Sequence, residues 1–474
     1  MSGRMRTAAA LIALLAAGPA LPQGASPQSA APQAPARAAR EVTLSFNERG
    51  QLEPASAAAR GSLAALAAAS TDVFVLSHGW RNDAATAECR YQQQVQGITA
   101  ALPAGARPLF VTIMWPSAMF PLVHDSCGAA PSRPFFADQE EHAVGSDVRI
   151  WAAAAFPAAA RSRRFDGDVD RLARLLSTGG AGQPKGSSRT RDAAEILVRW
   201  RDAADGVAPA RAQGIDGPGE RAVARTVDAV VAQYDTIQAA QSSQEAWSIL
   251  PSIAEVFSFW TMKARAGTVG GAGVHDVLQE IGAALPQGSR LHLVGHSFGG
   301  KLLAAALVGR SGVEPAFAET LTILQGALSH FAFSTAEQIR ALNVPTEIGG
   351  AYASVLQNRL AAVVAVTYSR QDRENQRWYP LGTILSQEAF ERGVPVYAAL
   401  GARGLEGPGA VAVALRNESV AARYSPSRPR IFNVDASGVI LGHSDVTQPS
   451  VYRLVADVVA VATRARAMEA QKKK

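Results

Sequence analysis

Residues 289–310, SRLHLVGHSFGGKLLAAALVGR, constrain the fold of this chain more than any other stretch. A short apolar run ends in GHSFG at residues 295–299, and an alanine- and leucine-rich helical segment follows directly. Strand, G-x-S-x-G and helix in this order are the layout of a nucleophile elbow, a turn so tight that the serine backbone is strained. Gly295 and Gly299 are required because a Cβ at either position would collide with the turn. The pattern predicts that Ser297 is a nucleophile.

Apolar segments with the pattern of buried strands recur along the chain and alternate with helical patterns. The predicted strands cover residues 41–46, 72–77, 108–115, 291–294, 320–325, 361–368 and 430–434, the first as an edge strand. The predicted helices between and after them cover residues 55–69, 84–102, 274–285 and 449–468. Buried strands that alternate with helices indicate an α/β fold, here a mostly parallel central sheet with flanking helices.

The N-terminal residues have the pattern of a secretory signal peptide. Arg4 and Arg6 precede an apolar run at residues 8–17, and small residues that suit cleavage follow. We therefore predict a signal peptide at 1–25, a flexible Pro/Ala/Gln linker at 26–40, and export to the periplasm or the medium. The remaining chain has no apolar run long enough to span a bilayer, so no stable membrane span is expected after the signal is removed.

The strand pattern is interrupted between two parts of the predicted core. The first part covers residues 41–116 and the second covers 269–474, whereas residues 117–268 have the pattern of a large, mostly helical cap. Helical stretches within this insertion are predicted at 168–176, 189–205, 220–240 and 244–265. Its aromatic residues either pack internally or roof an apolar pocket; they are Trp247, Phe257, Phe259 and Trp260.

Composition and spacing argue against several classes of function. The formal charge of +6 is modest for 474 residues and forms no basic stripe with interleaved aromatics, so no nucleic-acid partner is expected. No metal-binding spacing occurs, and the glycine-rich stretches 179–188 and 267–273 lack the strand that precedes a phosphate loop. We therefore expect no metal and no other cofactor.

Cys89 and Cys127 fit an oxidising compartment, as one disulfide or as two separate thiols.

A serine hydroxyl needs a base to take its proton, and His443 is the predicted base. Only His330 and His443 follow Ser297, and only His443 lies between a late strand and the last helix. The alternative is a hydrogen-bonded loop histidine without a catalytic role. His443 belongs to a second Gly-His-Ser, but Val446 replaces the final glycine of an elbow, so Ser444 is not a predicted nucleophile.

The base in turn needs a carboxylate that fixes its tautomer, and Asp372 is the predicted acid. Asp372 lies just beyond the strand at 361–368, where the carboxyl end of a parallel strand brings a loop to the ligand-binding edge. The alternative is a surface salt bridge with Arg370 or Arg373. Asp435 and Asp445 are the reserve candidates for the acid.

A developing oxyanion needs backbone donors, and two amides are predicted to supply them. The amide of Phe298 lies at the start of the helix after the elbow. The amide of Trp80 follows His78 and Gly79 at the carboxyl end of an earlier strand. Gly79 permits the turn, and His78 is predicted to be a structural, hydrogen-bonded histidine.

Together these residues resemble the α/β-hydrolase superfamily of serine hydrolases. The matching features are the HGW segment at 78–80, the GHSFG elbow, Asp372 and His443, and their order is that of the family. The resemblance covers about 41–115 and 268–468; the cap and residues 393–429 match nothing in it. It implies acyl transfer to water, in which Ser297 attacks a carbonyl, His443 moves the proton and Asp372 holds the imidazolium.

The resemblance leaves more than one function open. We expect an exported serine hydrolase of the esterase or lipase type, which acts on a small-molecule or lipid-like carboxylic ester without a cofactor. The same three side chains also serve amidases, thioesterases and acyltransferases. A catalytically silent binding protein with this fold is the alternative outside the enzymes.

Overall fold

The structure of the 474-residue chain is a computed structural model. It describes residues 39–117, 148–149, 152–153, 159–177, 188–204, 227–228, 231, 262–344, 346, 349–376, 398–428 and 430–472. The predicted signal peptide, most of the predicted linker and large parts of the predicted cap lie outside the described residues. The domain boundaries therefore stay predictions.

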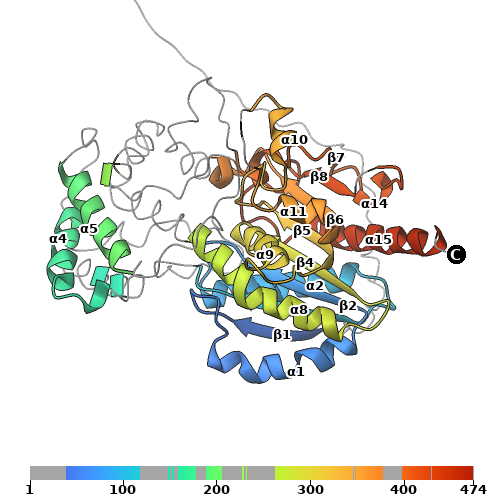
Figure 1. Cartoon of the computed structure of the whole chain (residues 1–474), viewed down its shortest axis with the longest axis horizontal. Helices are drawn as coiled ribbons and strands as arrows, with labels where there is room; N and C mark the ends of the chain where they lie inside the picture. The colour runs from blue at the N-terminus through green and yellow to red at the C-terminus, as the bar shows by residue number, and fades with distance from the viewer. Residues whose placement is uncertain are drawn as a thin grey trace, which may run out of the picture. The chain divides into compact units, whose positions relative to one another are not determined.

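A single sheet of eight strands, all parallel, forms the centre of the described structure (Figure 1). The strand order is β1-β3-β2-β4-β5-β6-β8-β7, so β1 is an edge strand, as predicted. The predicted α/β class is confirmed. The strands are β1 (Arg40–Ser45), β2 (Asp72–Ser77), β3 (Pro108–Met114), β4 (Arg290–His296), β5 (Ala318–Leu324), β6 (Ala361–Tyr368), β7 (Val411–Ala414) and β8 (Ile431–Asp435).

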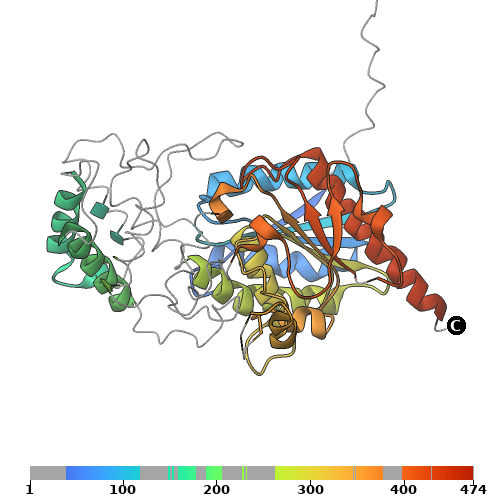
Figure 2. The same cartoon turned by 90° about the horizontal axis from the view of Figure 1, so that it is seen from above.

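Helices cover both faces of the sheet, which explains the unbroken apolar sequences of its central strands. Every residue of β2 and of β5 is buried. Val73 and Val75 face the apolar layer of α1 (Ala57–Ala68), α8 (His275–Ala284) and α9 (Phe298–Val308). Phe74 and Leu76 point to the opposite layer, which includes α2 (Ala84–Ala101) and α15 (Pro449–Lys472). Figure 2 shows α2 in light blue and α15 in red on one side of the sheet, with α1 and α8 on the other.

The strand register brings several loops to one edge of the sheet. Ser77 at the end of β2 pairs with Gly295 near the end of β4, and His296 pairs with Leu324 at the end of β5. Tyr368 at the end of β6 pairs with Asp435 at the end of β8. The connections that follow these five strands therefore start at the same edge, which we call the carboxyl edge.

The sequence analysis missed several short elements. β7 lies within residues 393–429, which matched no expected pattern; only Val413 of its four residues is buried, so it has no recognisable apolar run. It pairs with β8 at the edge of the sheet. The other missed elements are α10 (Ala336–Arg340), α11 (Ala353–Gln357), α13 (Leu400–Arg403) and α14 (Val420–Arg423). The segment predicted as a helix at 55–69 begins with a short η1 (Pro54–Ser56) before α1.

Two of the helices predicted in the insertion are present in the described residues. They are α4 (Phe165–Ser177) and α5 (Ser188–Ala204), with a short η2 (Ala159–Arg161) before them. The rings of Phe165 and Trp200 lie 5.4 Å apart, and Arg199 pairs with Asp168 at 2.5 Å. The helix predicted at 220–240 and the aromatic residues named above lie largely or wholly outside the described residues.

A continuous helical segment leads back into the core. Residues 262–269 are helical, a π-helical turn η3 (Gly270–Val274) follows, and α8 continues from it. A Cβ on Gly270 would lie 2.1 Å from the Leu302 carbonyl oxygen, so the glycine allows η3 to pack directly against α9. The glycine-rich stretch at 267–273 is thus part of a helical connection, consistent with the absence of a strand before it.

Two further observations bear on the sequence predictions. Cys89, in α2, is disulfide-bonded, while Cys127 lies outside the described residues. Among the described residues, no helix combines the length and the apolar character that a membrane crossing requires.

Candidate active site

Ser297 occupies a strained turn between β4 and α9. Its backbone has φ 56° and ψ −124°, a positive φ that a residue with a side chain rarely adopts. A Cβ on Gly295 would lie 2.6 Å from backbone atoms of Gly299 and Gly300, and one on Gly299 would lie 2.2 Å from the Ser77 oxygen. The two glycines are therefore required by close backbone approach, as the motif predicts.

The loop after β2 lies directly against this turn. A Cβ on Gly79 would be 2.7 Å from the Cβ of Ser297. The carbonyl of Gly79 accepts hydrogen bonds from His78 Nδ1 at 3.0 Å and from Asn82 Nδ2 at 3.0 Å. Burial lowers the pKa of His78 to about 4, so this imidazole is neutral at ordinary pH. His78 is thus a buried, hydrogen-bonded histidine, as predicted.

Three side chains from three loops form a hydrogen-bonded chain at the carboxyl edge. His443 Nε2 lies 2.8 Å from Ser297 Oγ, and His443 Nδ1 lies 2.9 Å from Asp372 Oδ2. A carboxylate only accepts hydrogen bonds, so Nδ1 carries the proton and the neutral ring accepts from the serine hydroxyl at Nε2. The structure therefore brings together the three residues that the sequence singles out.

The surroundings of His443 make it a stronger base than an ordinary histidine. Burial alone lowers its pKa, but the charge of Asp372 and the hydrogen bond to it outweigh burial and leave the pKa raised. The side chain is 16% exposed, whereas Asp372 is fully buried. Of these two side chains, only the imidazole of His443 is therefore in contact with solvent.

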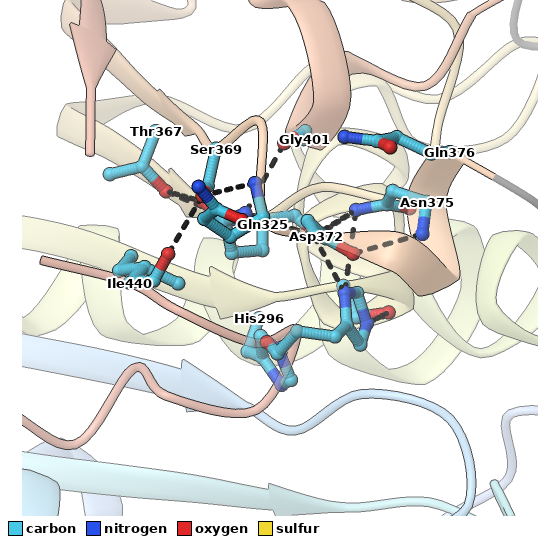
Figure 3. A network of polar contacts seen from close by, with 12 residues as sticks. His296, Gln325, Thr367, Ser369, Asp372, Asn375, Gln376, Gly401 and Ile440 are labelled. Atoms are coloured by element: carbon cyan, nitrogen blue, oxygen red, sulfur yellow. Dashed lines mark hydrogen bonds and ion pairs between the residues drawn. The ribbon is translucent and has the colours of Figure 1, made fainter. Parts of the chain in front are cut away.

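Amide groups hold Asp372 in its charged form (Figure 3). Its Oδ2 accepts from Asn375 Nδ2 at 2.8 Å and from Gln325 Nε2 at 2.9 Å, in addition to His443. Its Oδ1 accepts from the backbone N–H of Asn375 at 2.9 Å. Burial raises the pKa of this carboxyl, but the charge of His443 and these hydrogen bonds lower it below its ordinary value. Asp372 therefore stays ionised.

The two amide side chains are fixed in orientation by their other contacts. Gln325 accepts from the Thr367 hydroxyl at 2.9 Å through Oε1, which directs its Nε2 to Asp372. Gln325 has φ 47°, and its carbonyl accepts from Asn375 Nδ2 at 2.9 Å. Sequence reasoning missed both residues. A polar residue at the end of the predicted strand 320–325 was the available signal for Gln325, and a D-x-x-N spacing was the signal for Asn375.

The alternative candidates make other contacts. Asp435 accepts from the backbone N–H of Ser437 at 2.9 Å, and Asp445 accepts from that of Leu441 at 3.2 Å. Asp372, rather than either of these, is the carboxylate bonded to the His443 ring.

The two predicted oxyanion donors belong to residues next to the nucleophile turn, since Phe298 follows Ser297 and Trp80 follows Gly79, which packs against Ser297. Phe298 begins α9, and the rings of Trp80 and Phe298 have centroids 6.3 Å apart. The guanidinium of Arg81 lies 5.4 Å above the Trp80 ring. That the amides of Trp80 and Phe298 stabilise an oxyanion stays a prediction.

Within the described residues, no group of three or more His, Cys, Asp or Glu side chains has an arrangement that could hold a metal ion. No protein-family model matches the chain. Neither the curated proteins nor the solved structures provide a match.

Proposed function

We propose that this protein is a serine hydrolase of the α/β-hydrolase type, which cleaves a carboxylic ester through an acyl-enzyme on Ser297. The observation that carries the proposal is the double hydrogen bond of His443, to Asp372 on one side and to Ser297 on the other. The strained turn at Ser297 and the parallel sheet beneath it support the same proposal.

In the acylation step, the Ser297 oxygen attacks the ester carbonyl carbon while His443 Nε2 takes the hydroxyl proton. The C–O bond to the alcohol then breaks, and His443 returns the proton to the leaving oxygen. In the second half, a water molecule gives a proton to His443 and attacks the acyl carbon. The Ser297 oxygen leaves with that proton, and the acid is released.

Asp372 stabilises the imidazolium that forms in both halves. The pKa of its partner His443 is raised, so the imidazole holds the proton. Four N–H donors keep the Asp372 carboxylate ionised. The proton therefore stays on the imidazole, and Asp372 acts by charge and orientation.

The orientation of the loop after β2 supports Trp80 as an oxyanion donor. The Gly79 carbonyl points at His78 and Asn82. In a trans peptide the following N–H points in the opposite direction, so the Trp80 amide is directed away from these two side chains. Each such donor contributes about 3 kcal/mol to transition-state stabilisation.

The N-terminal pattern supports export as part of the proposal, with a signal peptide at 1–25.

Within the hydrolases, the hydrogen-bonded chain alone does not separate esters from amides or thioesters. We select an ester because its alkoxide leaving group is far less basic than the amine nitrogen anion that an amide would release, so it needs less help from the protonated His443. The choice is tested directly below.

The test is a panel of p-nitrophenyl esters from acetate to palmitate, assayed with the wild type and with Ser297→Ala. We expect turnover of at least one ester by the wild type and loss of that turnover in Ser297→Ala. The variant should keep its unfolding free energy within about 1 kcal/mol of the wild type. Wild-type-like turnover by Ser297→Ala would overturn the proposal. A matching amide and thioester of the preferred acyl group then separate the hydrolase classes.

A further inference from the structure

His296, the residue before the nucleophile, contacts the loop that carries His443. It ends β4 and is 5% exposed. Its Nε2 lies 2.8 Å from the backbone carbonyl oxygen of His443, and the two rings have centroids 4.9 Å apart with planes inclined at 43°. Figure 3 shows His296 beside the network around Asp372. The side chain next to Ser297 thus reaches the main chain of the residue bonded to Ser297.

The bonding partner fixes the protonation of this imidazole. A carbonyl oxygen only accepts, so His296 carries its proton on Nε2 and donates it to His443. Burial keeps the pKa of His296 well below its ordinary value, and the positive charges of His443 and Arg90 lower it further. His296 therefore remains a neutral donor when His443 becomes an imidazolium, and no second cation forms beside it.

Buried Ile440 and Val446 fix the two ends of the loop around His443, whereas the residues between them are less buried. Leu441 is 66% exposed, and Gly442 precedes His443 directly. The hydroxyl of Ser369 donates to the Ile440 carbonyl at 2.7 Å, which ties the loop to the segment before Asp372. At residue 443 itself, the bond from His296 holds the main chain, while Asp372 and Ser297 contact the ring.

We propose that His296 is a positioning residue, which sets the distance between His443 Nε2 and Ser297 Oγ through its bond to the His443 carbonyl. Because His296 and Ser297 are consecutive, a shift of the nucleophile turn also shifts the His296 side chain, and with it the hydrogen bond to the main chain of His443. This inference rests on the proposed hydrolase function. A displacement of the base by about 1 Å would lower turnover by about 100-fold.

The test compares His296→Gln with His296→Asn. The glutamine amide nitrogen can reach the position of His Nε2 and restore the donor, whereas the asparagine amide ends about one bond short of it. We expect kcat of His296→Asn to fall about 10- to 100-fold with KM changed less than about twofold, and His296→Gln to stay within about threefold of the wild type. His296→Phe, which has no donor, should behave like His296→Asn.

A second measurement does not depend on turnover. The His443 Nδ1 proton, bonded to Asp372, should give a downfield proton resonance that persists in His296→Gln and broadens or disappears in His296→Asn. Unchanged kcat and an unchanged resonance in His296→Asn would overturn the positioning role. Absence of turnover in the wild type, with the resonance still lost in His296→Asn, would instead refute the hydrolase function and keep the anchoring.

Discussion

Asp–His–hydroxyl chains lie at both ends of the sheet: β4 contributes His292 to one, and Ser297 of the other directly follows β4. At the carboxyl edge, Asp372, His443 and Ser297 are bonded in series. At the amino end, His292 of β4 lies 3.2 Å from Asp72 Oδ1 through Nε2 and 3.0 Å from Thr320 Oγ1 through Nδ1. Both imidazoles donate to a carboxylate and accept from a hydroxyl. Residue types and hydrogen-bond order alone therefore do not distinguish the two hydroxyls.

The partners of the two carboxylates differ in charge. Asp72 also accepts from the Arg290 guanidinium at 2.9 Å, so a fixed cation shares its charge. Asp372 is bonded to neutral amides besides His443. Burial, with the Arg290 charge opposing Asp72, leaves the pKa of His292 lowered, whereas that of His443 is raised. Only the imidazole at the carboxyl edge is prepared to take a proton.

The two hydroxyls differ in backbone setting. Thr320 lies within β5, paired with His292 of the neighbouring strand and buried on both sides. Ser297 lies on a turn at positive φ just beyond the end of β4, against the Gly79 loop. In the proposed hydrolase, residue types and hydrogen-bond order alone therefore do not make a nucleophile, and the charge of the partners and the strained turn distinguish Ser297 from Thr320.

The largest expected effect comes from removing each carboxylate. Asp372→Asn should lower kcat by about 10⁴-fold, because an amide can no longer fix the tautomer or stabilise the imidazolium. Asp72→Asn should leave kcat of the folded protein unchanged and lower the unfolding free energy by about 3 to 5 kcal/mol, because it breaks a buried pair with Arg290. Ester turnover and urea unfolding measure the two effects.

Equal losses of kcat in Asp372→Asn and Asp72→Asn would contradict this difference, because the hydrogen-bonded chain at the amino end would then also contribute to turnover. An unchanged rate in Asp372→Asn would remove the role from Asp372 and pass it to Asp435 or Asp445.

Titration of His443 and titration of His292 should change the unfolding free energy with pH in opposite directions. The base must be neutral, so kcat/KM should fall on the acid side with a midpoint at the raised pKa of His443, which lies above 6.5. Below that midpoint, kcat/KM should fall about tenfold per pH unit. The raised pKa of His443 also gives stability that is present below 6.5 and lost as pH rises through the folded pKa. The lowered pKa of His292 gives the reverse, because the unfolded chain binds the proton more readily and stability falls as pH drops below 6.5.

A pH series of urea unfolding, with His292→Gln and His443→Gln as matched variants, checks these signs. The acid loss of stability should shrink in His292→Gln but not in His443→Gln. A rate midpoint below 6.5 would contradict the assignment of His443 as a base of raised pKa.

The smallest expected effect is that of Thr320→Val. It removes the hydroxyl bonded to His292 Nδ1 and leaves a buried nitrogen without that donor, which costs about 1 to 3 kcal/mol of unfolding free energy. Turnover per folded molecule should stay within about twofold of the wild type. A loss of turnover comparable to that of Ser297→Ala would show that the two chains are coupled.

The sheet was largely predictable because its central strands are buried on both faces. The predicted segments 72–77 and 361–368 coincide with β2 and β6, since their apolar runs are bounded by turn residues. β7 was missed because only Val413 of its four residues is buried, so the strand has no recognisable apolar period. Boundaries elsewhere moved by one or two residues, as in β5, which ends at Leu324 rather than at Gln325.

The candidate site was predictable where a residue follows a recognisable strand or motif. Ser297 and Asp372 follow predicted strands, and His443 follows the last of them. Gln325 and Asn375 left only weak signals in the sequence, because their contact with Asp372 depends on a positive φ and on the turn after residue 372. Such contacts come from three-dimensional packing and leave no periodic signal.

The central claim is that the hydroxyl of Ser297, and not that of another residue, is activated for attack. Labelling of the folded protein with a fluorophosphonate, followed by peptide mapping, tests it most directly. We predict one adduct, on the peptide that contains Ser297, with no adduct in Ser297→Ala. A folded wild-type protein that stays unlabelled, or that carries the adduct elsewhere, for example on Ser444, would contradict the account.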